Sequence, residues 1–257
     1  MRIMIAVLSP LPPGSRPEPN RCDAHAILGV VPGRAAGASI PVYLEVGAKR
    51  VFACAYDWPG WCRAGKDEAS ALETLAAYAR RYAAVAKEAR VPFAVRGHAN
   101  LTVIERIPGS ATTDFGAPAE IASRDTEFLT RKEAERITGL VAAAWVVFDG
   151  VVSQAPAELR KGPRGGGRAC DPIAAHVLDA EAAYASKLNL RLRAPAYTDR
   201  RGVQAFRDEI ASVLRAPSDG KPLRERGWPA RYAARRIAWH VLDHAWEIED
   251  RSEPIKA

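Results

Sequence analysis

Hydrophobic and polar residues follow two different periods along the chain, and the first is that of β-strands. From residue 40 apolar side chains alternate with polar ones, and Gly47-Ala48 interrupts the alternation, a pattern typical of a β-hairpin. A run of apolar residues three or four positions apart follows the N-cap candidate Asp67 and indicates a long helix. The expected elements of this small α+β module, residues 40–107, are strands at 40–46, 51–56 and 101–105 and one helix at 67–90.

The second period is helical and continues to the end of the chain. After residue 125 apolar residues recur every three to four positions, without strand-like alternation. Thr130 and Glu133 have the spacing of a capping box, and Asp171-Pro172 combines an N-cap acid with a proline at the first helical position. The pattern predicts an all-α four-helix bundle over 125–257. Its helices are expected at 131–155, from Asp171 onward, at 200–215 and from about Pro229.

Two segments show neither period. Residues 1–39 are rich in proline and glycine, so we expect a disordered leader that need not belong to the functional protein. Residues 108–124 are rich in Gly, Pro, Ser, Thr and Ala, the composition of a linker. The sequence therefore predicts two domains, an α+β module at 40–107 and a helical bundle at 125–257.

Composition narrows the environment in which the chain is expected. The four cysteines, Cys22, Cys54, Cys62 and Cys170, form no CxxC pair and predict neither a disulfide framework nor a zinc knot, which favours a reducing cytoplasm. No apolar run approaches the roughly 20 residues that span a bilayer, so no membrane is expected. The net charge of +7 permits anionic ligands. Because the basic residues form no recognisable base-reading or stacking pattern, nucleic acid is not an expected partner.

Three histidines carry the candidate chemistry. His240 and His244 are four residues apart in the last helix, so both imidazoles share one face, through which the apolar stripe also runs. Such a pair either binds a metal or hydrogen-bonds to backbone. His176 lies on the inward face of the second helix and supplies a third ligand. Three protein ligands are typical of a catalytic metal with one coordination position left for water or substrate.

The stretches Ala174–Glu181, with His176, and His240–Glu247 resemble the DinB superfamily of four-helix bundles. Its members hold a metal through one histidine on the second helix and an HxxxH pair on the fourth. The resemblance, over about residues 125–255, implies a divalent metal, usually zinc or nickel. It also implies a thiol-dependent transferase or isomerase that uses a low-molecular-weight thiol, and it allows a homodimer. In the first module Trp58–Leu72 resembles HicB-type antitoxin domains, without their ribbon-helix-helix or helix-turn-helix.

Five further side chains are candidates for roles around the metal. Asp243 and Glu247 follow the two histidines by three residues, where they would orient the imidazoles or transfer protons, unless they form a solvated helix face. Arg164 and Arg168, in a glycine-rich loop before the second helix, are candidates for binding a carboxylate or phosphate of the cofactor, and the alternative is a flexible solvated loop. Cys170, beside Arg168 and that helix's N-terminus, is a candidate thiolate or a resting structural thiol.

These observations predict a metal-dependent transferase or hydrolase. The metal-bound thiol or water would act on a small-molecule substrate, with His176, His240 and His244 as ligands. The competing interpretation is non-enzymatic: a metal-stabilised interaction or stress-response module whose partner surface lies in the first domain. The two differ in whether solvent and thiols can reach the metal's open position.

Overall fold

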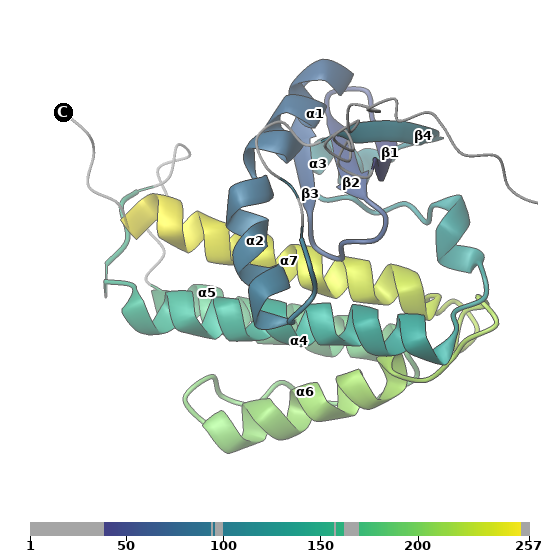
Figure 1. Ribbon diagram of the computed structural model, residues 1–257. Coiled ribbons are helices and arrows are strands. Elements are labelled where there is room, and N and C mark those ends of the chain that lie inside the picture. The colour runs from purple at the N-terminus through teal and green to yellow at the C-terminus, as the bar shows by residue number, and fades with distance from the viewer. Residues whose placement is uncertain (1–38, 94, 96–99, 157, 162–169, 253–257) are drawn as a thin grey trace, which may run out of the picture. The chain divides into compact units, whose positions relative to one another are not determined.

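The structure, a computed structural model, describes the chain except for residues 1–38, 94, 96–99, 157, 162–169 and 253–257. The expected leader therefore lies outside the described residues, apart from residue 39. The described residues combine a mixed four-stranded sheet with seven α-helices and one 3-10 helix (Figure 1).

The sheet has the strand order β3-β2-β1-β4, and its strands are β1 (Ile40–Val46), β2 (Val51–Ala55), β3 (Cys62–Gly65) and β4 (Leu101–Pro108). β1 pairs antiparallel with β2 and parallel with β4, and β2 pairs antiparallel with β3. The hairpin and the later strand were predicted. β3 was not, because its four residues are too few to show alternation and follow a Pro-Gly turn.

The helix predicted at 67–90 is two helices, α1 (Glu68–Ala77) and α2 (Ala79–Glu88). Asp67 caps α1, since its side chain accepts a hydrogen bond from the Ser70 backbone N–H. The chain changes direction at Tyr78, so α1 packs on β2 and β3 while α2 packs on α4. The tertiary contacts of the two halves explain the break, which helical periodicity alone does not reveal.

The segment predicted to link the two parts is tied to the sheet. It contains α3 (Ala111–Phe115) and the 3-10 helix η1 (Ser123–Thr126). Glu45 of β1 is fully buried, and its carboxylate accepts hydrogen bonds from the Thr113 hydroxyl and from the backbone N–H groups of Ala119 and Glu120. These bonds compensate the burial of the carboxylate and hold the segment against β1.

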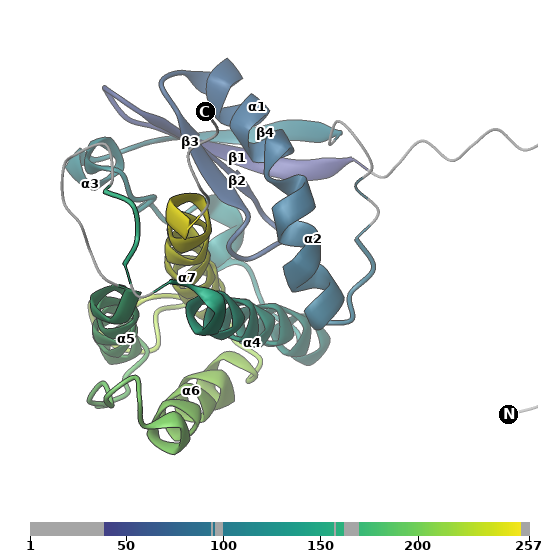
Figure 2. The ribbon, with the colours of Figure 1, turned by 90° about the vertical axis from the view of Figure 1, so that its left-hand side faces the viewer.

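Four long helices follow, close to the predicted ranges: α4 (Arg131–Gln154), α5 (Cys170–Lys187), α6 (Arg200–Leu214) and α7 (Ala230–Ser252). Thr130 caps α4 in a capping box with Glu133. α7 packs against α4, α5 and α6. Figure 2 looks along α7 and shows it between the sheet and the other three long helices.

α7 joins the sheet and the helices into one hydrophobic core. Buried residues of the sheet, such as Leu44 and Val51, belong to the same cluster as Ile237 and Trp246 of α7. The turn between β2 and β3 approaches α7 closely at Gly60, where a Cβ would lie 2.6 Å from a methyl carbon of Leu242. Gly60 also has a positive φ of 90°, so this contact requires glycine.

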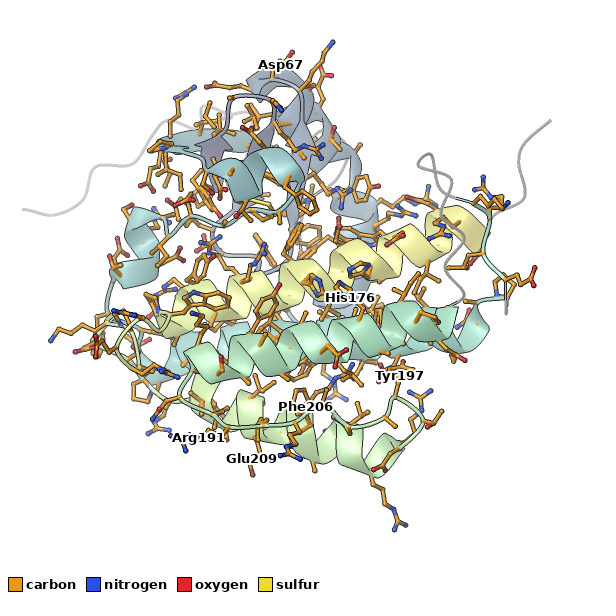
Figure 3. All side chains as sticks on the ribbon, turned by 180° about the vertical axis from the view of Figure 1, so that it is seen from behind. Asp67, His176, Arg191, Tyr197, Phe206 and Glu209 are labelled. Atoms are coloured by element: carbon orange, nitrogen blue, oxygen red, sulfur yellow. A yellow bond between two sulfur atoms is a disulfide. The ribbon has the colours of Figure 1, made fainter. Side chains whose placement is uncertain are left out.

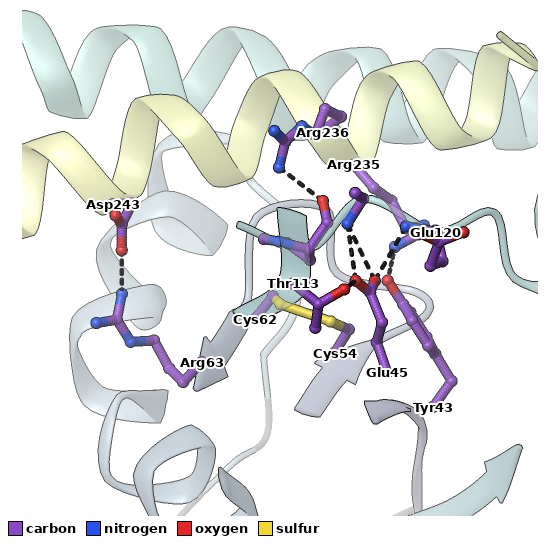
Figure 4. The surroundings of a disulfide bond; sticks show 12 residues. Tyr43, Glu45, Cys54, Cys62, Arg63, Thr113, Glu120, Arg235, Arg236 and Asp243 are labelled. Carbon is purple, nitrogen blue, oxygen red and sulfur yellow. Dashed lines mark hydrogen bonds and ion pairs between the residues drawn. A yellow bond between two sulfur atoms is a disulfide. The ribbon is translucent and has the colours of Figure 1, made fainter. Parts of the chain in front are cut away.

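The prediction that the cysteines form no disulfide is wrong for one pair. Cys54 of β2 and Cys62 of β3 face each other across the sheet, with their Cα atoms 4.1 Å apart, and form a disulfide (Figure 4). The sequence hid this pairing because β3 was not recognised. Cys170 is free and buried. The cysteines therefore no longer support the expected cytoplasmic location, which stays a prediction.

One helix departs from the expectation that no apolar run reaches membrane-spanning length. Within the described part of the chain, α4 alone combines sufficient length and mean hydropathy to cross a membrane. It packs against α2, α6 and α7, and residues such as Leu140 and Phe148 are fully buried in those contacts. The buried core helix of a globular protein can be as long and as apolar as a membrane-spanning helix, so length and composition do not distinguish the two.

Candidate metal centre

The three predicted histidines lie together between α5 and α7. His240 and His244 are one turn apart on α7, and His176 faces them from α5, where Figure 3 labels it. The candidate ligand atoms of the three side chains all lie within 4.8 Å of one another. The ring centroids of His240 and His244 are 4.7 Å apart, and His176 lies 5.2 Å and 5.1 Å from them. The structure therefore brings the three predicted histidines together, but the prediction that His176 faces inward is wrong, because its side chain is exposed.

The cluster is buried on one side and open on the other. His240 is 8% exposed, His244 is partly buried and His176 is exposed. A group of imidazole nitrogens with one accessible side is the arrangement of metal sites that keep a coordination position for water or substrate.

His240 is suited to bind a metal because its ring is kept neutral and one of its nitrogens has no hydrogen-bond partner among the described atoms. Burial lowers the pKa of His240 well below its ordinary value, and the nearby His244, His176 and Arg236 act in the same direction. Its Nδ1 is buried and has no hydrogen-bond partner among the described atoms. An unsatisfied buried polar atom costs about 1–3 kcal/mol, and closure of the histidines around a divalent ion would offset that cost.

Glu247 fixes the ring of His244. Its carboxylate lies 2.9 Å from His244 Nδ1 and accepts a second hydrogen bond, at 2.8 Å, from Arg251. The contact with His244 is the main cause that lowers the pKa of Glu247, with Arg251 acting in the same direction. When Nδ1 carries the proton toward Glu247, Nε2 of His244 keeps its lone pair for a metal.

Asp243, the other predicted acid, points elsewhere. Its carboxylate forms an ion pair of 2.8 Å with Arg63 of β3, as Figure 4 shows. The sequence could not reveal this contact, because the two residues are 180 positions apart.

Aromatic residues and one arginine complete the surroundings of His240. The Tyr184 ring stands edge-on to the His240 ring with centroids 5.7 Å apart. The Arg236 guanidinium lies over the rings of Trp239 and Tyr184, at 4.7 and 5.6 Å, and donates to the Pro118 carbonyl. Sequence analysis missed both Tyr184 and Arg236. The available signal was the position of Arg236, four residues before His240 and therefore on the same helix face.

The loop residues proposed for cofactor binding cannot be placed. Arg164 and Arg168 lie outside the described residues. Cys170 begins α5, and burial together with the nearby Asp171 carboxylate raises the pKa of its thiol. Of the two alternatives for Cys170, this favours the resting structural thiol over the thiolate, because desolvation opposes the charged form.

Compared with known proteins, the chain matches no family model, no curated protein sequence and no solved structure. The resemblance to the DinB superfamily therefore depends on the residues quoted from the sequence and is carried forward as part of a proposal.

Proposed function

We propose that this chain is a divalent-metal-binding protein whose four long helices form a DinB-like bundle, and that it acts as a metal-dependent transferase or hydrolase. The observation that carries the proposal is the cluster of His176, His240 and His244, whose candidate ligand atoms lie within 4.8 Å of one another. Two helices supply these residues, and they are near enough to one another for small side-chain shifts to close them around one ion.

Each residue has a defined part in this proposal. The three histidines would hold zinc or nickel, and Glu247 keeps the His244 ring in place through its Nδ1. A bound divalent ion lowers the pKa of a coordinated water or low-molecular-weight thiol, so that a nucleophile exists at neutral pH. Three uncharged imidazoles leave the site with a net positive charge, which favours an anionic fourth ligand. A small molecule would be the substrate.

The exposure of His176 supports an enzyme over a metal-stabilised interaction module. A metal that only holds two helices together is normally enclosed by four protein ligands, whereas a catalytic one keeps an open position. His240 is buried and His176 is exposed, so the cluster is accessible from the α5 side.

Cobalt substitution with thiol titration tests this function. The chain, with Co²⁺ in place of the native metal, is titrated with a small thiol and followed by absorption. We expect a thiolate-to-cobalt charge-transfer band that saturates, and loss of cobalt binding in His176→Ala. Cobalt that binds stoichiometrically but gives no such band, and no change in its d–d spectrum with thiol or other small ligands, would contradict an open site and favour the interaction module.

A further inference from the structure

A cavity of about 620 Å³ lies beside the histidine cluster, and it is lined by β3, by residues 160–161 between α4 and α5, and by the C-terminal half of α7. Its size suits a small molecule. Most of its lining is charged: the residues are Arg63, Arg160, Lys161, Asp243, Trp246, Glu247, Asp250 and Arg251.

Glu247 belongs both to the cavity and to the histidine site. One of its oxygens faces His244 Nδ1 and the other faces Arg251, and the same side chain lines the cavity. A molecule in the cavity therefore approaches the carboxylate that positions His244.

The acids that line the cavity are already neutralised. Asp243 pairs with Arg63, and Glu247 with Arg251. Asp250 pairs with Arg81 of α2, which does not line the cavity. These carboxylates therefore leave little negative charge to oppose an incoming anion.

Two basic residues of the lining, Arg160 and Lys161, keep free hydrogen-bonding capacity. Arg160 is exposed, and its guanidinium donates to the backbone carbonyl of Asp250, which leaves further N–H donors of the fork. Lys161 is exposed and, within the described part of the chain, has no carboxylate partner. Arg160 and Lys161 both line the cavity, and exposed cationic groups of this kind bind carboxylate or phosphate oxygens.

We propose that this cavity binds a small organic anion, whose carboxylate or phosphate group is held by Arg160 and Lys161 while the rest of the molecule extends along Trp246 toward Glu247 and His244. That this anion is the substrate of the histidine site depends on the proposed function. Its binding to the cavity does not.

Ligand-observed NMR on the metal-free full-length chain tests the proposal, with succinate and glycerol 3-phosphate as probes. The test variant is Arg160→Gln, Lys161→Gln. The matched control is Arg131→Gln, Lys132→Gln, an exposed basic pair at the start of α4 that loses the same charge. We expect saturable binding of at least one probe, weakened about tenfold or more in the test variant and less than about twofold in the control. Unchanged thermal unfolding of both variants verifies their folding.

Two results would overturn the proposal: no saturable binding of either probe, or equal weakening in the two double variants. The probe that binds shows whether the cavity prefers a carboxylate or a phosphate group. Metal content, measured on the same preparations before the metal is removed, separates this inference from the proposed function. A chain that binds metal but no anion refutes the cavity assignment alone, and one that binds anion but no metal refutes the metal-dependent function alone.

Discussion

At the scale of single residues, the chemistry of the site depends on how each polar group is compensated. His240 is buried and neutral, with an unpartnered Nδ1, whereas His244 has Glu247 at its Nδ1. The two imidazoles are thus made suitable for metal binding in different ways. Burial keeps His240 unprotonated, and the Glu247 carboxylate fixes the orientation of the His244 ring. Glu247 is in turn held by Arg251.

We expect Glu247→Ala to weaken metal binding about 10- to 100-fold, because the His244 ring loses the acceptor that orients it. Competition against a chelating indicator measures the affinity. Glu209→Ala, which removes an exposed carboxylate of α6, is the control and should leave the affinity unchanged. An affinity in Glu247→Ala equal to that of the control would show that Glu247 does not position a ligand.

A second residue-scale prediction concerns Glu181 of α5, which is fully buried and accepts a hydrogen bond from the Trp145 indole. Burial raises the pKa of Glu181 from 4.5 to about 7, although Arg207 nearby lowers it. The folded chain therefore binds a proton more tightly than the unfolded chain does. Its contribution to stability is complete below about pH 4.5 and is lost as pH rises through about 7.

Glu181→Gln removes this titration. Between pH 4.5 and 8 the free energy of unfolding of the parent should fall by about 3 kcal/mol relative to that of the variant, since one pKa unit corresponds to about 1.4 kcal/mol. Denaturant unfolding across this range measures it. A stability difference between the two proteins that does not change with pH would refute the assigned pKa.

At the scale of elements, α7 is the helix on which both the site and the packing depend. One face carries the histidines, and another packs on the sheet, where Trp239 meets Phe52 edge to face at 6.1 Å. Arg235 is buried and joins α7 to η1 and β1. Its guanidinium donates to the carboxylate of Asp125 and, as Figure 4 shows, to the hydroxyl of Tyr43. A displacement of α7 would therefore disturb the sheet and the histidine cluster together.

Arg235→Ala should lower the free energy of unfolding by about 3–5 kcal/mol, because it leaves the fully buried Asp125 without its counter-charge. Chemical denaturation measures the loss, with the exposed Arg224→Ala as the control. The double variant Arg235→Ala, Asp125→Ala should lose less than the sum of the two single variants. Additive losses would mean that the two side chains do not stabilise each other.

The features that the sequence predicted correctly depend on local signals such as helix caps and residue spacing. The features that it missed depend on contacts between residues distant in sequence. Thr130 marked the start of α4, and the spacing of His240 and His244 placed both rings on one face before their surroundings were known. By contrast, the break at Tyr78 and the partner of Cys54 depend on tertiary packing and strand pairing. Residues distant in sequence likewise form the cavity, so no local period indicates it.

At the scale of the whole molecule, the sheet and the long helices contribute to the same site. The guanidinium of Arg63, on β3, lies 4.1 Å from the centre of the ring of Tyr78, the residue that joins α1 to α2. Arg63 also forms an ion pair with Asp243 of α7. The lining of the cavity thus includes Arg63 from the sheet together with residues of α7. If the long helices bind metal as proposed, Arg63 of β3 would help to shape access to the cavity beside the histidines. The predicted homodimer is a separate property and stays a prediction.

Metal content of the purified chain tests the central claim most directly. The protein is prepared without a histidine tag and analysed for zinc, nickel and other divalent metals, beside His240→Ala, His244→Ala and a His98→Ala control. We predict close to one metal ion per chain in the parent and the control, and near-complete loss in the double variant. A parent that contains no metal and binds neither added zinc nor added nickel, or a double variant that keeps its metal, would contradict the assignment of these histidines as ligands.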